Sequence, residues 1–209
     1  MSSRHWFLVL AAAVIAACAC DDMTLFRAGS EYFPLTQDSR WTYSDGLVTL
    51  TDSVAGDSVV DGRSAIVFLR SFAPEFWLRD QTGAWRFLRR TIIRGGQEYE
   101  LEARYEHAYQ LPLVLGAAWS DAFGDTVTVM GTESLFVRDS LSGRVAAIED
   151  ITTPAGTFTE CYRLEFFRSV RTDTLAETAW TEWLAPGVGL VKRMAGTDSL
   201  VLVDYRLGP

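Results

Sequence analysis

Few residues of this chain could support nucleophilic or metal-dependent catalysis. His107 is the only histidine after residue 17, which excludes zinc sites that need two histidine ligands. The sequence contains no Gly-x-Ser-x-Gly, Cys-x-x-Cys or phosphate-binding loop. A thiol–imidazole pair of Cys161 with His107 stays open as an alternative, but a packed, unreactive cysteine is the commoner situation. We therefore predict no catalytic residues, no metal and no cofactor, and we expect His107 to be a surface or rim residue.

Two clusters of charged residues could still bind ions. Three glutamates alternate along one strand face, roughly 6.6–7 Å apart, so they could hold calcium or act as paired carboxylates only with help from other loops. Four arginines precede them and could contact lipid phosphate or an acidic partner, although pairing with the glutamates across a hairpin is the simpler interpretation. We predict a solvated acidic face and structural ion pairs. The residues are Glu98, Glu100 and Glu102, and Arg86, Arg89, Arg90 and Arg94.

The N-terminus carries the one motif with a specific chemical consequence. Arg4 precedes an apolar run from Trp6 to Ala17, and Ile15-Ala16-Ala17 occupies the three positions before Cys18. A positive start, a short apolar core and small residues before a cysteine are typical of a lipoprotein signal peptide. The run is shorter than the roughly 20 residues that a membrane-spanning helix needs. We predict that Cys18 is lipidated.

Two alternatives to lipidation at Cys18 remain open. Ala17-Cys18-Ala19 could be cut as an ordinary signal-peptidase site, and Cys20 is a second candidate for the acyl group. With Cys18 as the anchor, residues 1–17 form the signal helix and residues 18–31 a lipidated tether. The protein is then expected outside the cytoplasm, in a bacterial cell envelope, with the membrane as its partner through the lipid. Asp21-Asp22 leaves the choice of membrane open.

The remainder of the chain has the composition of one folded domain. Removal of residues 1–17 takes away Arg4, so 18 basic residues face 27 acidic ones, a net charge of −9. An acidic chain has no basic surface for nucleic acid. Hydrophobic residues make up 48% of the chain, with seven Trp and twelve Phe, so a sizeable core is expected and disorder is excluded over most of the length. We predict a single domain over residues 32–209.

Short segments separated by glycine and proline turns indicate an all-β fold. Arg94-Gly95-Gly96-Gln97 predicts a hairpin turn, because paired glycines accept positive φ angles. Residues 98–105 alternate and predict one half-buried strand, with a helix as the alternative. We predict a curved antiparallel sheet that forms a partial barrel or a sandwich. Later strands are expected at 126–130, 134–138, 144–151, 157–170, 177–184, 189–194 and 199–207, with Gly124 and Gly143 in turns.

The second half of the domain repeats the beginning of the first. Phe33-Pro34-Leu35-x-x-Asp38-x-x-Trp41 matches Leu111-Pro112-Leu113-x-x-Gly116-x-x-Trp119. The repeat would divide the domain into residues 32–110 and 111–209, and chance similarity is the alternative. Each copy predicts a proline-stiffened connection that leads into a turn and then an inward tryptophan. We expect Trp41 and Trp119 to be buried equivalents.

Three stretches together resemble a group of uncharacterised bacterial envelope lipoproteins with a TapB-like β domain. They are residues 32–35 with Trp41 and Tyr43, residues 152–161, and residues 183–192. The resemblance spans most of the chain after the signal and implies a curved antiparallel sheet or partial barrel. Such sheets are similar, by looser analogy, to the lipid- and lipoprotein-carrier folds of the envelope. The group implies no catalytic residues, and Asp38, in place of an expected glycine, predicts a differently built turn.

The cysteines and tryptophans are expected to be structural. Cys20 and Cys161 could form a disulfide that closes a loop of roughly 140 residues, but a packed Cys161 and an unpaired Cys20 in the tether are favoured. The tryptophans are expected in the core, where a curled sheet could also use part of them to line an apolar cavity. The residues are Trp77, Trp85, Trp119, Trp180 and Trp183.

Two functional hypotheses follow from these patterns. The first is a non-enzymatic envelope lipoprotein that binds or scaffolds, with a lipid, another apolar ligand or an envelope protein as its partner. The second is an envelope hydrolase that uses acidic residues alone, supported only by the excess of Asp and Glu. A wide apolar cavity would favour the first, and two inward carboxylates in one cleft would favour the second.

Overall fold

The computed structural model describes residues 32–129 and 133–209, and the regular structure within these residues consists of β-strands. The predicted all-β fold with a curved antiparallel sheet is confirmed. The predicted signal helix and tether, residues 1–31, lie outside the described residues. Within the described part of the chain, we find no helix long and apolar enough to cross a membrane. The strands are β1 (Arg40–Ser44), β2 (Thr49–Val60), β3 (Arg63–Arg70), β4 (Ala73–Arg79), β5 (Gly83–Leu88), β6 (Thr91–Arg94), β7 (Gln97–Glu100), β8 (Arg104–Gln110), β9 (Ala118–Val129), β10 (Glu133–Thr153), β11 (Gly156–Arg171), β12 (Leu175–Ala185), β13 (Gly189–Ala195) and β14 (Asp198–Arg206).

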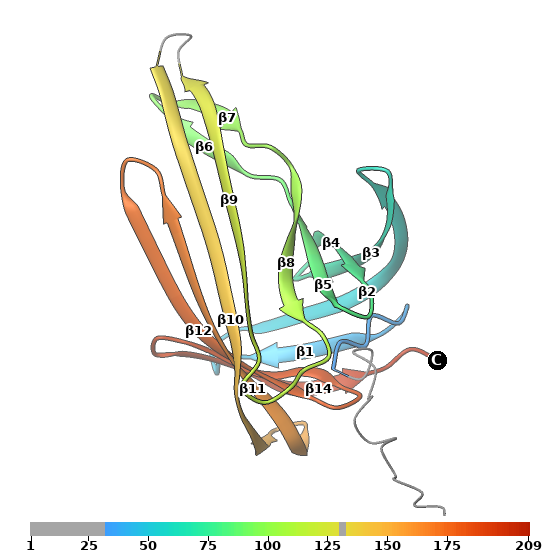
Figure 1. The fold of residues 1–209 in the computed structure, drawn as a ribbon. Helices are drawn as coiled ribbons and strands as arrows, with labels where there is room; N and C mark the ends of the chain where they lie inside the picture. Colours follow the sequence, from blue (N-terminus) through green and yellow to red (C-terminus); the bar gives the residue numbers. More distant parts are fainter. Residues whose placement is uncertain (1–31, 130–132) are drawn as a thin grey trace, which may run out of the picture.

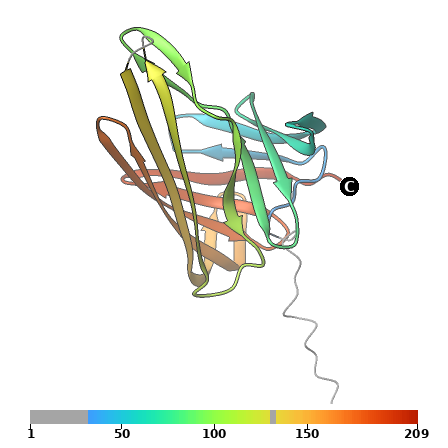
Figure 2. The ribbon, with the colours of Figure 1, turned by 45° about the horizontal axis from the view of Figure 1, so that its top comes forward.

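Twelve of these strands form one antiparallel, nearly closed, barrel-like sheet (Figure 1). Its order is β8-β5-β4-β3-β2-β1-β14-β13-β12-β11-β10-β9, so six strands from residues 40–110 are followed by six from residues 118–206. The two runs join where β1 pairs with β14. Strands that follow each other in the chain are neighbours in the sheet, with two exceptions: the separate β6–β7 hairpin lies between β5 and β8 in the chain, and β8 and β9 are the two edges of the sheet. The tilted view shows the two runs curling to face each other across the interior (Figure 2).

β9 and β10 are longer than the sequence pattern predicts. The expected separate strands over 134–138 and 144–151 are parts of one 21-residue strand, β10. Gly143 and Gly124 lie inside β10 and β9 rather than in turns, because aromatic rings cover them. A Cβ added at Gly143 would lie 2.3 Å from a ring atom of Trp119, and one at Gly124 would lie 3.1 Å from the ring of Phe136. These glycines mark close packing within a strand, so the turn prediction is wrong at both positions.

The alternating segment 98–105 is two strands rather than one. β7 ends at Glu100 and β8 begins at Arg104. Between them Leu101 packs in a small apolar cluster between β6–β7 and β9–β10. The alternation then changes phase, because Glu106 is fully buried in the interior while the Tyr105 hydroxyl donates a hydrogen bond to the tip of the β2–β3 hairpin. The prediction of a single strand is wrong because packing of the hairpin, rather than a continuous ladder, fixes this segment.

The first copy of the repeat forms a tight corner that leads into β1. We call residues 33–41 with Val54 the first corner. The Ser39 amide donates to the Thr36 carbonyl (3.2 Å), and the Asp38 amide donates to the Val54 carbonyl (3.1 Å). The Val54 amide donates in turn to the Ser39 carbonyl (2.9 Å). Val54 stands at a β-bulge, where the register between β2 and β3 shifts.

The second copy makes the same set of hydrogen bonds at its entrance to β9. We call residues 111–119 with Val145 the second corner. The Ala117 amide donates to the Val114 carbonyl (2.9 Å), and the Gly116 amide donates to the Val145 carbonyl (3.0 Å). The Val145 amide donates to the Ala117 carbonyl (2.9 Å), and Val145 also stands at a register shift, here between β10 and β11. The repeat therefore has a structural meaning.

Asp38 does not change the turn, contrary to the expectation from its sequence. Its φ angle is 66°, and φ of Gly116 is 83°. Both residues are thus in the left-handed region, which aspartate enters at a smaller cost than most side chains. Glycine is favoured at this position, but the turn forms without it.

Trp41 and Trp119 are both buried, as predicted. Their exposed fractions are 3% and 7%. Each indole N–H finds a backbone carbonyl: Trp41 donates to Val188 (2.7 Å), and Trp119 donates to Ala108 (3.1 Å). A buried indole usually needs such an acceptor, so each corner closes with both an apolar contact and a hydrogen bond.

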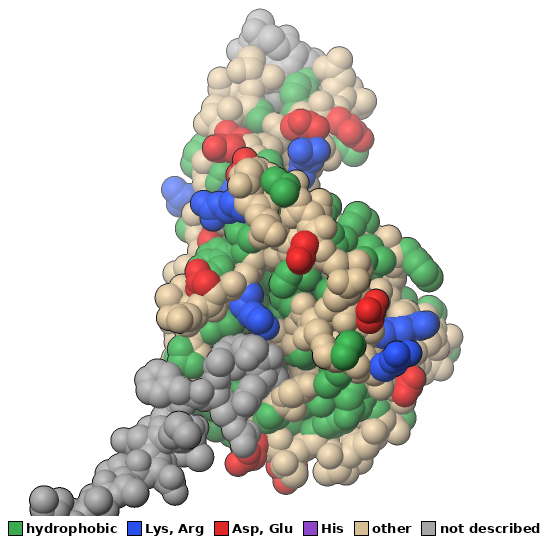
Figure 3. All heavy atoms as spheres, turned by 90° about the vertical axis from the view of Figure 1, so that its right-hand side faces the viewer, with side chains coloured by type: hydrophobic (Ala, Val, Ile, Leu, Met, Phe, Trp, Pro, Cys, Tyr) green, Lys and Arg blue, Asp and Glu red, His purple; other side chains and the backbone are tan. Residues whose placement is uncertain are grey.

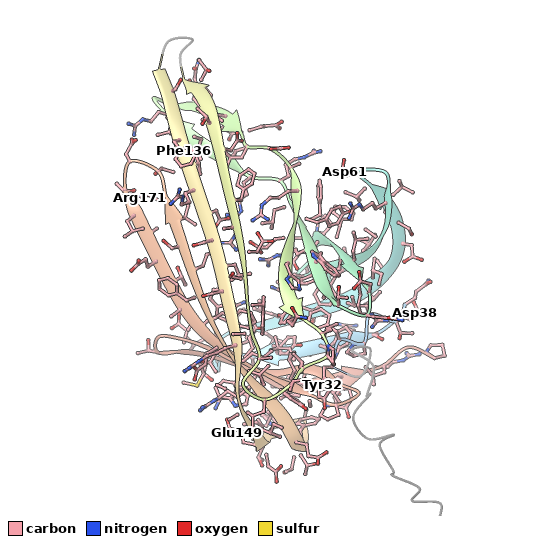
Figure 4. All side chains as sticks on the ribbon, in the orientation of Figure 1. Tyr32, Asp38, Asp61, Phe136, Glu149 and Arg171 are labelled. Carbon is pink, nitrogen blue, oxygen red and sulfur yellow. The ribbon has the colours of Figure 1, made fainter. Side chains whose placement is uncertain are left out.

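The segment Tyr32–Leu35, which we call the plug, closes the lower end of the main core. Tyr32 packs edge-to-face on Tyr162, with 4.8 Å between ring centroids, and Phe33 packs on Tyr109 at 4.6 Å. Figure 4 shows Tyr32 at the base of the sheet, far from Asp61 at the tip of the β2–β3 hairpin. The plug thus belongs to the apolar core, and the interior above it is more polar.

Candidate functional site

A cavity of about 230 Å³ lies inside the sheet, between the two runs of strands. Strands β3, β4, β5 and β8 line one side of it, and β10–β13 line the other. Alternation along β12 turns Thr178, Trp180 and Glu182 inward together. The charged residues of its wall are four arginines and one glutamate: Arg70, Arg86, Arg168, Arg193 and Glu182.

Arg168 is fixed by two buried carboxylates. Its Nε and Nη2 atoms donate to both oxygens of Asp139 (3.0 and 2.6 Å), and Nη2 also donates to Glu106 (2.6 Å). Glu106 has no exposed surface and accepts a further bond from Arg86 Nη2 (3.0 Å). Burial lowers the pKa of Arg168, but Asp139 and Glu106 outweigh it, so the net pKa is raised. Charges this deep are tolerated only when they are paired, and here the pairs set the position of Arg168.

Glu182 is held mainly by neutral donors. It accepts a hydrogen bond from the Tyr109 hydroxyl (2.7 Å) and one from the Trp180 indole (3.0 Å). Burial, followed by the charge of Glu182, raises the pKa of Tyr109 well above its usual value, so this hydroxyl stays a donor. The nearest Arg193 nitrogen is 3.7 Å from the Glu182 carboxylate, and its guanidinium lies 5.4 Å from the Trp180 ring centroid. Glu182 therefore does not depend on Arg193 for its hydrogen bonds.

Arg70 is also loosely paired. Its Nε atom is 3.6 Å from Asp52, and Nη1 is 3.5 Å from Glu75, both beyond normal hydrogen-bond distance. Burial lowers the pKa of Arg70, while Glu75 and Asp52 raise it further than burial lowers it. For Asp52 the effects are reversed: burial raises the pKa of its carboxyl and Arg70 lowers it, and the net pKa is raised. Arg70 remains a cation with free donor capacity.

The aromatic residues of the cavity wall come from the same strands. Phe166 and Trp180 are stacked, with 4.9 Å between centroids and an interplanar angle of 8°. Tyr109 meets Phe166 edge-on at 5.6 Å, and Trp77 lies on the opposite run. A smaller pocket of about 40 Å³ lies toward the plug and shares Arg70, Trp77 and Tyr109 with the cavity. The cavity can therefore offer charged donors and apolar surface to one ligand.

The edges of the sheet, β8 and β9, meet at a seam beside this cavity. Side chains join them: Asp121 accepts hydrogen bonds from the His107 amide (2.9 Å) and from Arg104, and Asp125 accepts one from the Glu102 amide (2.9 Å). Open strand edges expose unpaired backbone groups. In this seam, carboxylates from β9 accept hydrogen bonds from some of the backbone amides at the edge of β8. The interior of the sheet that holds the cavity, which we call the lumen, is therefore bordered here without a complete backbone ladder.

The sequence-predicted site residues are not brought together. Cys18 lies outside the described residues, so its lipidation stays a prediction. Glu98, Glu100 and Glu102 are exposed, as predicted for a solvated face. Cys161 is fully buried, which confirms a packed cysteine, and Cys20 lies outside the described residues.

The arginine cluster is paired differently from the prediction. Arg86 bonds Glu106, Arg90 bonds Asp139, and Arg94 bonds Asp173, rather than the glutamates of the hairpin. The prediction of cross-hairpin pairs is wrong because the fold brings other carboxylates closer: buried Glu106 and Asp139, and Asp173 at the surface. Arg89 is exposed.

His107 lies half-buried on the face of β8 opposite Glu106. Its ring stacks on Trp85, with 5.1 Å between centroids and an interplanar angle of 20°. Its Nε2 atom is shielded from solvent and accepts or donates no hydrogen bond within the described residues. It lies further from solvent than the expected surface position, and it is on the other side of the strand from the cavity.

Sequence reasoning missed the inward charges that define the site. Arg168 follows two phenylalanines and Glu182 lies between two tryptophans, so each interrupts an otherwise apolar strand face. This interruption could have revealed the site from the sequence, because a charged side chain at an inward-facing strand position must find a partner in the interior. The face drawn in Figure 3, by contrast, carries acidic and basic side chains interspersed among apolar ones.

Comparisons with known proteins cover this chain unevenly. Residues 120–195, which run from β9 into β13, match the DUF3108-like family model. No curated protein matches the chain. The matches do not include a TapB-like domain, so that part of the resemblance stays a prediction.

Two solved structures align with most of the chain. One is a candidate lipoprotein from Parabacteroides distasonis, with 14% identity over 84% of this chain and 98% of that chain, at a TM-score of 0.42. The other is a candidate exported protein with a YmcC-like fold from Bacteroides fragilis, with 13% identity over 84% of this chain and 99% of that chain, at a TM-score of 0.35.

Proposed function

We propose that this protein is a lipid-anchored, non-enzymatic binding module of the bacterial cell envelope, which holds a small, partly apolar ligand in its lumen. The cavity between the two runs of strands carries this proposal. It brings aromatic side chains together with five charged ones, so it can offer a small ligand both apolar surface and hydrogen-bond partners. The lipoprotein signal around Cys18 supports the location and the anchor.

The lumen suits ligand holding better than proton transfer. Glu106 and Asp139 share Arg168, and Glu182 is bound by a tyrosine and a tryptophan. A general acid or base needs a proton that moves to a reacting group, whereas these carboxylates are already engaged in positioning arginines and aromatic rings. This arrangement favours the binding hypothesis over a hydrolase based on acidic residues.

The anchor is tested by acyl labelling and intact mass of the full-length protein made in a bacterial host. We expect the wild type to carry lipid, Cys18→Ala to lose it, and Cys20→Ala to keep it. Loss in Cys20→Ala alone would move the acylated residue to Cys20. An unlabelled wild type would contradict the lipoprotein proposal.

The ligand is tested by native mass spectrometry of the same protein extracted from membranes. We expect a bound species of defined mass that is released on denaturation. Thr178→Trp adds a large ring to the cavity wall and should lower the bound fraction, whereas Thr128→Trp, on an exposed position of β9, should not. Absence of any bound species in the wild type, or equal occupancy in both variants, would contradict a ligand in the lumen.

A further inference from the structure

We infer, resting on the proposed function, that the lumen recognises its ligand through an oxyanion, a carboxylate or a phosphate ester, bound by Arg70, Arg86 and Arg193. The apolar part of the same ligand lies against the aromatic side of the cavity, around Phe166 and Trp180.

Unused donors on the three arginines support this assignment. Each guanidinium carries five N–H groups in a planar fork. Arg70 and Arg193 reach their carboxylates only at 3.5–3.7 Å, and Arg86 Nη1 is 3.9 Å from Glu75. Arg86 Nε is shielded from solvent and has no hydrogen-bond partner within the described residues. A buried donor left unsatisfied costs free energy, and an oxyanion in the cavity would satisfy it.

The distribution of charge points the same way. The whole chain has a net charge of −8, yet the cavity wall carries four arginines against Glu182. The carboxylates that pair with these arginines, Glu106, Asp139, Asp52 and Glu75, lie outside the cavity lining. The charged groups that face a ligand are therefore mostly N–H donors, which suit the oxygens of an oxyanion.

Carboxylates behind the wall hold two of its arginines in position. Glu106 bonds both Arg86 and Arg168, and Asp139 bonds Arg168 through both oxygens. Of the three proposed ligand-binding arginines, Arg86 is thus fixed in advance and loses little freedom on binding, which is the advantage of a pre-organised site. Arginine forks match carboxylate and phosphate oxygens two at a time, so geometry adds selectivity for an oxyanion over a halide.

The test is calorimetric titration of the detergent-solubilised full-length protein with four small probes. Benzoate and phenyl phosphate carry the two oxyanions, benzyl alcohol is the neutral analogue, and benzylammonium is the cationic one. We expect binding of at least one oxyanion probe, at least tenfold tighter than benzyl alcohol, with affinity that falls as salt rises. The preferred oxyanion then distinguishes a carboxylate ligand from a phosphate ester.

Arg193→Met is the decisive variant, with Arg144→Met as its matched control. Arg193→Met keeps an apolar stem beside Trp180 and leaves Glu182 its bonds from Tyr109 and Trp180. Arg144 has the same charge but is 65% exposed and pairs with Glu165 away from the cavity. We expect at least a tenfold loss of oxyanion affinity in Arg193→Met and no change in Arg144→Met, with circular dichroism of both like the wild type.

The outcomes separate this inference from the proposed function. Benzyl alcohol that binds as tightly as the oxyanions, or an unchanged oxyanion affinity in Arg193→Met, would overturn the oxyanion assignment while the bound species seen by native mass spectrometry could still stand. No oxyanion binding to the wild type would also overturn it. The lumen proposal itself falls only with the mass-spectrometric result and its Thr178→Trp variant.

Discussion

The first and second corners share their hydrogen bonds but not their neighbours. In both, a left-handed residue and a valine at a β-bulge lock the chain before a buried tryptophan. The strands that follow the two corners differ, however, in one of their neighbours. β1 pairs with β14 through a backbone ladder, whereas β9 meets β8 through the side chains of the seam. The repeated motif therefore encodes a local corner and does not encode how the sheet closes.

Equivalent positions in the two corners have been adapted to these different neighbours. Asp121 lies two residues after Trp119, and Tyr43 lies two residues after Trp41. The Tyr43 hydroxyl donates to the Leu190 carbonyl (3.0 Å), while Asp121 accepts from the backbone of β8. One position is thus a donor on a strand with a backbone-paired neighbour on each side, and the other is an acceptor at an open edge.

The largest expected effect comes from removing either tryptophan. Trp41→Ala and Trp119→Ala should each lower the free energy of unfolding by roughly 3–5 kcal/mol, the range for deleting a large aromatic from a core. Urea denaturation of the full-length protein measures this, and Trp→Phe at each position should cost less because the ring volume is partly kept. A loss below about 1 kcal/mol at either position would mean that the two corners are not energetically equivalent.

Substitution of Asp121 in the seam should lower the free energy of unfolding more than substitution of the equivalent Tyr43 in β1. Asp121→Ala leaves the His107 amide and Arg104 without this acceptor, and loss of a charged hydrogen-bond partner costs roughly 1.5–3 kcal/mol. Tyr43→Phe removes one neutral hydrogen bond and should cost about 1 kcal/mol. Hydrogen exchange should speed up at β8 in Asp121→Ala only. Equal exchange in both variants would show that the seam does not rely on Asp121.

The left-handed residues of the corners should respond in opposite directions to substitution. Gly116→Ala should lower stability by about 1–2 kcal/mol, because a Cβ disfavours this φ and no neighbouring atom lies within 4 Å to add a clash. Asp38→Gly should be neutral or raise stability by less than about 1 kcal/mol, because glycine adopts this positive φ without steric cost but loses more backbone freedom on folding. Thermal denaturation of the two variants compares them. Destabilisation by Asp38→Gly would indicate that the aspartate side chain itself supports the first corner.

The smallest effect concerns a second bulge between β10 and β11. The register of β10 and β11 shifts again near Glu149, opposite Cys161, whose thiol is buried against the Phe158 carbonyl (3.5 Å). Burial raises the pKa of Cys161 to about 11. As pH rises, the thiol of the unfolded chain therefore loses its proton before the thiol of the folded protein does. The free energy of unfolding should fall between about pH 9 and pH 11, and at pH 9 the loss should be only a few tenths of a kcal/mol.

The reactivity of this thiol provides the measurement. At pH 8, Ellman's reagent should leave Cys161 unmodified in the folded protein and modify it once urea unfolds the chain, with Cys161→Ala as the control. Rapid reaction in the folded protein would mean that the second bulge opens readily.

Much of the fold was predictable from local patterns. The hydrophobic alternation, the turn glycines and the prolines predict many short antiparallel strands, and the repeat predicts two buried tryptophans at matching corners. These features depend on residues close together in the chain, whose conformational preferences act before any distant contact forms. The errors at Gly124, Gly143 and residues 98–105 arise where a distant ring or hairpin overrides such local preferences.

The sequence by itself determined the strand-rich chain and its corners, and it predicts a lipoprotein signal, because each depends on short-range spacing and side-chain chemistry. The tertiary structure alone decided that Arg86 meets Glu106, that Arg168 meets Asp139, and that Asp121 closes the seam. Those partners are separated by 14 to 29 residues or belong to different runs of strands. Their pairing depends on strand register and curvature, since a shift of one residue turns an inward charge outward.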